Sequence, residues 1–380
     1  MGRLKERRVA FPGRKKRPAR VLFAAILLIV FYFLLFPYPL GRELVVRPRW
    51  AVALPQAGPA AASSPAPAGG SQEPAGTGSA AAFQLGDRFG FVRGDGTLLY
   101  TGKAVYRVAL SSTGFVSFTR LGTDWILQDP AGRREASYSV AGYPLLSPDG
   151  RRVFNVKTDL SGIIEMDRSG GVLWDRDFPS LITSISVQGD LVLVGLLNGT
   201  LALLDRHGSP LLEHAPGGSR IAVVVGDAAA PDGSRVAAVC GIDPQYLVVL
   251  KRSGTGYAPE TRESLPSSFR REVRMGFSPD SRCLFVEGAA GPGLFDTRGR
   301  MLRWVGLPGP LAGTAFARGG KVAAFASLEA GGARLVLEPM SGIPVGREAF
   351  PARGIFLGTI EGQLLLGWDD QVARIDVEAM

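Results

Sequence analysis

The stretch that decides the fold is Ile164-Glu165-Met166-Asp167-Arg168-Ser169-Gly170-Gly171-Val172-Leu173-Trp174. Apolar residues stand on both sides of a polar turn, which begins with Asp and ends with Gly, the residue that adopts positive φ without strain. This pattern predicts a β-hairpin. Related hairpins recur along the chain with turn glycines at Gly96, Gly132, Gly170, Gly208, Gly254, Gly299 and Gly342. Their spacing of 36 to 46 residues is about that of one four-stranded propeller blade.

A second series of turns alternates with the first, near residues 112–114, 147–150, 188–190, 230–233, 278–281, 318–320 and 361–362. Pro, Asp and Gly recur in these turns, and strand-like runs follow most of them. Seven turns of each kind predict two hairpins per blade, and therefore an all-β, seven-bladed propeller of four-stranded antiparallel blades. We further expect residues 97–101 to pair with 372–377, so that the two ends of the propeller share a blade and leave no exposed edge.

These residues carry a family resemblance. Residues 164–174 resemble the "LDxxTGxxLW" repeat of quinoprotein-like propellers, and residues 294–304 are a looser copy. The Ser-Pro-Asp turns at 147–150 and 278–281 resemble those of WD40 propellers. The resemblance covers about residues 86–380 and implies that Trp174 and Trp304 pack between blades.

A quinone-dependent enzyme of that family would need a cofactor platform, a calcium site and vicinal cysteines. Cys240 and Cys283 are not vicinal and lie in apolar runs, which favours buried free thiols over the alternative of a disulfide. His207 and His214 have no neighbouring metal-ligand or nucleophile motif, so we expect surface roles for them. We therefore expect no catalytic, cofactor or metal site and no enzymatic activity.

The net charge of +9 lies at the N-terminus. Residues 1–20 carry nine basic side chains and one acidic side chain, whereas the chain from Trp50 onward carries 31 basic and 32 acidic ones. The propeller thus has no positive excess for binding nucleic acid. Residues 21–36 are sixteen consecutive apolar residues, and the apolar segment continues to Leu40.

A basic run before an apolar segment predicts a signal-anchor helix at residues 21–40 that contacts a lipid bilayer. The basic residues before it would hold the N-terminus in the cytoplasm, chiefly Arg14, Lys15, Lys16, Arg17 and Arg20. Two alternatives are a cleaved signal peptide and a nucleic-acid-binding tail at residues 13–18.

The predicted organisation has four parts. Residues 1–20 form a basic cytoplasmic tail, 21–40 the transmembrane helix, 41–85 a linker rich in Ala, Pro, Gly and Ser, and 86–380 the propeller. The 36 arginines against seven lysines indicate a GC-rich, bacterial genome. We therefore expect a single-pass protein of the inner membrane with its propeller in the periplasm or outside the cell.

The expected function follows from the blades and from the missing motifs. Loops at the two ends of a propeller form broad platforms, so we predict a protein-binding or scaffolding platform in the cell envelope, with protein partners on a propeller face. The alternative is an enzyme or small-ligand sensor with its site in the central channel. In that case residues 270–274, which include Arg271 and Glu272, are the charge cluster to inspect. A contiguous apolar patch on one face would favour the platform.

Overall fold

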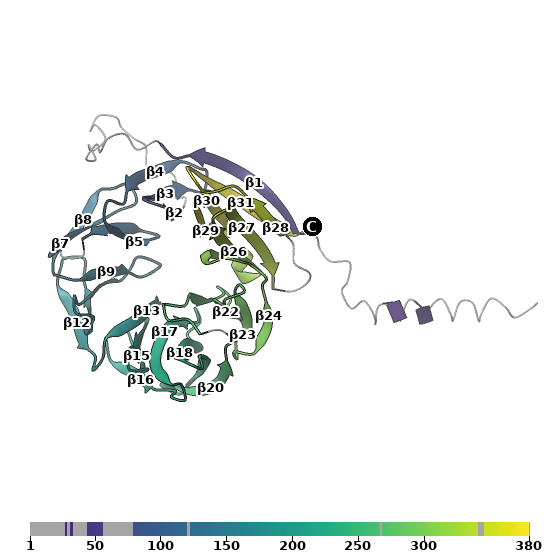
Figure 1. Ribbon diagram of the computed structural model, residues 1–380. Coiled ribbons are helices and arrows are strands. Elements are labelled where there is room, and N and C mark those ends of the chain that lie inside the picture. The colour runs from purple at the N-terminus through teal and green to yellow at the C-terminus, as the bar shows by residue number, and fades with distance from the viewer. Residues whose placement is uncertain are drawn as a thin grey trace, which may run out of the picture. The chain divides into compact units, whose positions relative to one another are not determined.

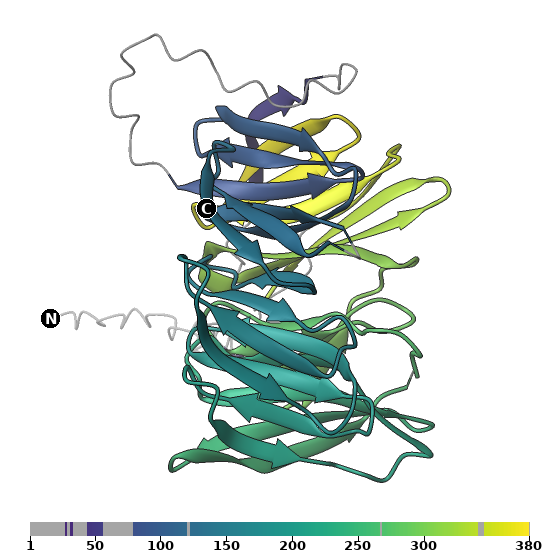
Figure 2. The same cartoon turned by 90° about the vertical axis from the view of Figure 1, so that its left-hand side faces the viewer.

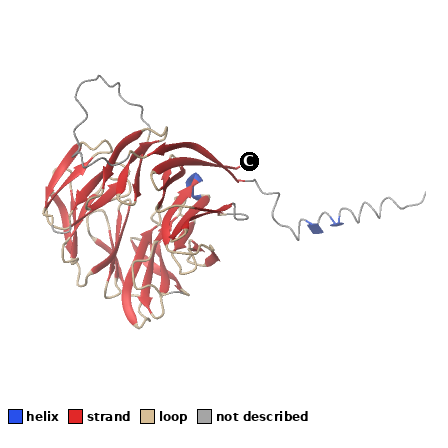
Figure 3. Cartoon of the chain, turned by 45° about the horizontal axis from the view of Figure 1, so that its top comes forward, coloured by secondary structure: helices blue, strands red, loops and turns tan. Residues whose placement is uncertain are grey.

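The computed structural model describes Leu27, Leu28, Phe31, Tyr32 and residues 44–55, 79–119, 122–266, 268–340 and 346–379. By its contacts the chain divides into two units, Met1–Glu43 and Leu44–Met380. In the second unit, strands form eight sheets arranged as blades around a ring (Figure 1). Figure 3 shows how completely strands make up this unit; its described helical element is a single 3-10 turn, η1 (Arg318–Gly320).

The blades are numbered in chain order. Blade I contains β2 (Ala80–Leu85), β3 (Arg88–Arg93) and β4 (Leu98–Lys103); blade II β5 (Arg107–Ser111), β6 (Gly114–Phe118), β7 (Asp124–Gln128) and β8 (Arg134–Ser139); blade III β9 (Tyr143–Leu146), β10 (Val153–Val156), β11 (Gly162–Met166) and β12 (Val172–Asp177); and blade IV β13 (Ile182–Gln188), β14 (Leu191–Leu196), β15 (Leu201–Leu204) and β16 (Pro210–His214).

The second half of the ring continues in the same way. Blade V contains β17 (Ile221–Ala229), β18 (Arg235–Ile242), β19 (Tyr246–Ser253) and β20 (Gly256–Ser264); blade VI β21 (Met275–Phe277), β22 (Cys283–Val286), β23 (Gly293–Asp296) and β24 (Met301–Trp304); blade VII β25 (Leu311–Ala317), β26 (Val322–Glu329), β27 (Gly332–Pro339) and β28 (Gly346–Phe350); and blade VIII β29 (Ile355–Ile360), β30 (Gln363–Trp368), β31 (Gln371–Ala379) and β1 (Leu44–Ala53).

The propeller has eight blades, so the prediction of seven is wrong. The two turn series each count seven because each one misses a different blade. Turns of the Gly170 type join the third and fourth strands of blades I to VII, and blade VIII lacks this turn because its fourth strand, β1, comes from the N-terminal side. Turns of the second series join the first and second strands of blades II to VIII. Two series of seven, offset by one blade, make eight.

Four turns of the first series open with an aspartate, and its hydrogen bonds explain why this motif recurs. The Asp167 carboxylate accepts the backbone N–H groups of Ser169 and Gly171, both at 2.8 Å. Asp129, Asp205 and Asp296 make the same pair of bonds in their own blades. An aspartate that binds the backbone two residues on favours a turn over other conformations.

Strand β1 closes the ring by pairing antiparallel with β31, with Val52 opposite Val372. In Figure 1 and Figure 2, β1 in purple lies beside the yellow C-terminal strands. The predicted pairing of residues 97–101 with 372–377 is therefore wrong, because β4 pairs with β3 instead. The termini do share a blade, but the closing strand comes from further upstream. Both β1 and β2 fall inside the range expected to be linker.

Tryptophan side chains join neighbouring blades. Trp174 on β12 donates its indole N–H to the carbonyl of Arg206 in blade IV, at 3.2 Å. Trp50 on β1 makes the equivalent bond to Gly94 O in blade I, at 2.8 Å. Both Trp174 and Trp304 lie against a Phe of their own blade, Phe154 and Phe295 respectively, but among the described residues Trp304 makes no such indole bond to the next blade.

Blade I has three strands among the described residues, and they correspond to the second, third and fourth strands of the other blades. In blade III, Phe178 follows the fourth strand and donates its N–H to Ser161 O in the turn between the second and third strands. Ala104 after β4 donates to Asp87 O, between β2 and β3, in the same way. No described strand therefore fills the first, innermost position of blade I.

The predicted transmembrane helix must be corrected. Four of the residues 21–40 are described, and they are helical; the topology residues Arg14, Lys15, Lys16, Arg17 and Arg20 lie outside the described part. Within that part, no helix is long and apolar enough to cross a membrane. This contradicts the predicted anchor helix and the single-pass inner-membrane location, and it leaves the predicted bilayer contact without support. The uninterrupted apolar run has sixteen residues, fewer than the roughly 20 that a helix needs to cross a bilayer core.

Candidate functional site

An inner cavity of about 610 Å³ lies against the first strands of blades II, III and IV. These strands are innermost in their blades, so their side chains line the inside of the ring (Figure 1). The wall is mostly apolar and includes one cation and one anion. It consists of Arg107, Tyr143, Pro144, Leu145, Val156, Leu160, Ile182, Thr183, Ser184, Ile185 and Glu272. A largely apolar cavity with a few polar groups is typical of a binding site.

A buried carboxyl group adjoins this cavity. Asp227 lies in the otherwise apolar strand β17, and the hydroxyl of the lining residue Ser184 donates a hydrogen bond to its Oδ2. Its Oδ1 has no hydrogen-bond partner. Burial raises the pKa of Asp227 to about 7, the bond from Ser184 opposes this rise, and the negative charge of Glu272 adds to it. Near neutral pH this carboxyl therefore exists in both protonation states.

The Ser184–Asp227 pair lacks the parts of a hydrolytic site. A serine nucleophile needs a general base, usually a histidine that a carboxylate orients. His207 lies in the turn after β15 and His214 ends β16, the fourth and outermost strand of blade IV. Across the ranges that the structure describes, no group of three or more His, Cys, Asp or Glu side chains could hold a metal ion.

The charge cluster at residues 270–274 contributes one residue to the cavity. Glu272 lines it, whereas Arg271 binds both carboxylate oxygens of the buried Glu287, at 2.8 and 3.0 Å. Arg274 donates to Ala312 O at 2.8 Å. The two arginines are therefore held by structural contacts, and the acid between them faces the cavity.

An apolar rim borders the cavity on one face of the propeller. We use this name for Leu160, Leu181, Leu197 and Ile221, whose side chains are 37–48% exposed. Leu160 and Leu197 lie in turns between second and third strands, Leu181 lies in the connection between blades III and IV, and Ile221 begins β17. Successive strands alternate in direction, so these four positions are all on the same face of the propeller. Backbone bonds join neighbouring segments: Ile182 N donates to Leu160 O at 2.9 Å and Leu197 N to Leu181 O at 2.8 Å.

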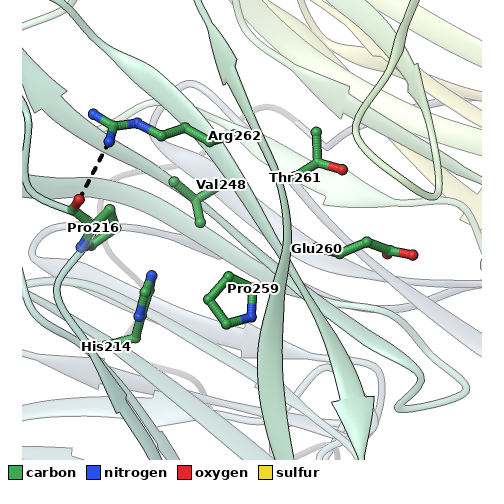
Figure 4. A pocket seen from close by; sticks show the side chains of 7 residues that line it. All are labelled: His214, Pro216, Val248, Pro259, Glu260, Thr261 and Arg262. Atoms are coloured by element: carbon green, nitrogen blue, oxygen red, sulfur yellow. Dashed lines mark hydrogen bonds between the residues drawn. The ribbon is translucent and has the colours of Figure 1, made fainter.

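A second, smaller hollow of about 260 Å³ lies between the outer strands of blades IV and V (Figure 4). His214, Val248, Pro259 and other residues line it. The Arg262 guanidinium lies 3.7 Å from the centre of the Tyr246 ring and donates to Gly217 O at 2.8 Å. Because the arginine is already held in this way, the hollow offers little free polar chemistry.

The two cysteines lie apart from both hollows. Both are buried and free. Burial raises the pKa of Cys240 to about 12 and that of Cys283 to about 11. Thiols of such high pKa are almost wholly protonated at neutral pH and are poor nucleophiles.

Sequence reasoning named Glu272 but missed Ser184 and Asp227. These two are 43 residues apart and come from neighbouring blades, so no linear motif joins them. The available signal was the aspartate itself, which stands in the middle of the apolar run at residues 221–229. A charged residue in a buried strand is rare without a partner.

Three comparisons place the chain among known proteins. A family described as "beta-propeller protein" matches residues 13–380. A protein of Treponema pallidum (strain Nichols), described as an uncharacterized protein, is 22% identical over 295 residues, which is 78% of each chain. The crystal structure of BamB from Moraxella catarrhalis superposes with a TM-score of 0.58 at 16% identity and covers 87% of this chain and 100% of that one. At this identity the structural likeness shows a shared fold.

Proposed function

This chain belongs to the beta-propeller protein family, and from that premise we propose that it acts as a protein-binding platform. The observation that supports the proposal is the apolar rim, four exposed aliphatic side chains on one face, three of which lie on segments joined by backbone hydrogen bonds. Contiguous exposed apolar surface on a folded domain marks a site of protein interaction. The blades hold the rim rigid, so little ordering entropy opposes binding.

The test is to place a charge on the rim. Leu181→Asp and Leu197→Asp should abolish chemical cross-links between the full chain and its partners in its native cells. Leu302→Asp is the matched control, because Leu302 is also exposed but lies on β24 at the outside of blade VI. Cross-links that persist in both rim variants would overturn the proposal.

We propose that the protein has no catalytic activity of its own. The cysteines are protonated, and Ser184 donates its hydrogen bond to Asp227 without a histidine base. Turnover of any small molecule by the purified chain, lost in Ser184→Ala, would refute this proposal.

The inner cavity supports a second candidate function, the binding of a small ligand that carries a cationic group. Two acidic groups, Asp227 and Glu272, outnumber the one lining cation, Arg107, beside apolar walls. Binding of a small aromatic amine, followed by calorimetry, should strengthen as the pH rises from 6 to 8 and should be lost in Asp227→Asn. Amine binding that stays the same between pH 6 and pH 8 would exclude this function.

The closer kinship with quinoprotein-like repeats is also a proposal. It is supported by the repeated Asp turns and by the indole bonds of Trp50 and Trp174 to the next blade. Replacing Asp167 by Asn should retain the turn, because the amide oxygen accepts the same two bonds, whereas Asp167→Ala should lower the thermal midpoint.

A further inference from the structure

Among the described residues, the inner edge of blade I has no neighbouring strand. Strand β2 pairs with β3 on one side, and no described strand pairs with its other side. The β2–β3 hairpin has a two-residue turn, so Leu85 and Arg88 form a hydrogen-bonded pair and the pairs alternate from there. The N–H and C=O groups of Ala80, Ala82 and Gln84 therefore point away from β3, toward the first position, which no described strand occupies.

Apolar side chains flank this position from both neighbouring blades. Val108 and Leu110 on β5 are half-buried and pack in the same cluster as Ala82. Phe356 on β29 is half-buried and packs with Phe83 and Leu85. Strand β2 itself has no charged residue. A strand added here would have apolar neighbours on both faces, as buried strands do.

We propose that this edge is a strand-acceptor site, which binds an extended, uncharged segment of a partner protein in the first position of blade I. The backbone edge of β2 supplies the hydrogen bonds of the mode known as β-augmentation. A segment of about six residues with large apolar side chains matches the six residues of β2 and contacts Val108, Leu110 and Phe356. The site is separate from the apolar rim and goes beyond the platform proposed above.

The composition of the segment next to β2 argues for a partner as the occupant, in place of that segment. Residues 56–78, which precede β2, contain Pro59, Pro65, Pro67 and Pro74 and no aliphatic or aromatic side chain larger than that of alanine or proline. Alanine cannot fill the space beside the half-buried ring of Phe356. The first strands of other blades are different in kind, as Leu311–Ala317 shows with Leu and Phe.

The experiment uses the full chain and a fluorescent synthetic peptide with the sequence of Leu311–Ala317, LAGTAFA, followed by anisotropy. The peptide should bind, and a version N-methylated at alternate residues should not, because it lacks the amide donors. Ala82→Pro removes one outward N–H and should weaken binding about tenfold, without disturbing the β2–β3 bonds. Ala82→Ser keeps that N–H and should bind within about twofold of the wild type.

A last variant separates the partner from the chain itself. In it, residues 56–78 are replaced by a Gly-Ser segment of the same length. Equal peptide affinity in this variant and the wild type supports the proposal. Binding by the variant alone would show that the chain fills its own site and would overturn the proposal, as would the absence of binding in both proteins or an equal loss in Ala82→Pro and Ala82→Ser.

Discussion

Replacing Asp227 by Asn should make the protein more stable at pH 8 and leave its stability at pH 4.5 almost unchanged. The carboxyl of Asp227 is buried beside Ser184, and its pKa is raised to about 7 from an ordinary value of 3.8. At a pH between these two pKa values, Asp227 holds a proton in the folded protein and releases it in the unfolded chain. Stability contributed by the neutral form is therefore present at low pH and is lost as the pH rises toward 7.

The size of the effect follows from the two pKa values. A pKa difference of one corresponds to about 1.36 kcal/mol. The difference of about three at Asp227 therefore corresponds to about 4 kcal/mol between pH 4 and pH 8. Asparagine resembles the protonated acid and does not titrate. The variant should therefore match the wild type within about 1 kcal/mol at pH 4.5 and exceed it by up to about 4 kcal/mol at pH 8.

Urea unfolding at half-unit steps from pH 4.5 to 8 measures this difference directly. Asp190→Asn is the control, because Asp190 is exposed in the turn between β13 and β14 and its replacement should leave the pH dependence unchanged. A difference between wild type and Asp227→Asn that stays constant with pH would refute the reasoning, because it would mean that Asp227 titrates alike in the folded and unfolded states.

Three further predictions concern the turns, the closure and the thiols. Asp205→Ala removes the acceptor of two backbone N–H groups and should cost about 1–2 kcal/mol in urea unfolding; an unchanged midpoint would show that water replaces both bonds. Trp50→Ala removes the indole bond to Gly94 and should cost about 2–3 kcal/mol and speed proteolysis near β1, whereas unaltered cleavage would mean that pairing with β31 alone holds the strand. Cys240 and Cys283 should react with a thiol reagent at pH 8 only as fast as the protein unfolds, and rapid labelling without urea would contradict their burial.

The sequence predicts the kind of fold well because the propeller repeats a local motif. Each Asp turn needs only the backbone within four residues of it, so its signal survives in a linear reading, as at Asp167. The number of blades depends on where the two ends meet, which is not local. Strand β1 contains Pro48 and adjoins the Ala- and Pro-rich stretch, and its composition hides its role as the fourth strand of blade VIII.

In the candidate site, too, the sequence predicts local features and misses those that depend on contacts between distant residues. Glu272 stands out because it belongs to a run of charges, and the structure places it at the inner cavity. Ser184 and Asp227 can be recognised as a pair only from their hydrogen bond between two blades, which the linear sequence does not show. The apolar rim is equally dispersed, since each of its residues comes from a different connection, and single leucines in loops carry no signal by themselves.

The closure of the ring also has a consequence in time. Val52 pairs with Val372, 320 positions later, and at about 5–20 residues per second a ribosome needs roughly 15 to 60 seconds to make the chain between them. Throughout that interval β1 lacks its partner strand, and unpaired strand edges can pair with other chains. Its centre reads Arg47-Pro48-Arg49, two like charges around a residue that cannot donate to a ladder. Charges and proline on a strand edge discourage such pairing, so we expect these three residues to keep the newly made β1 from pairing with other chains until β31 emerges.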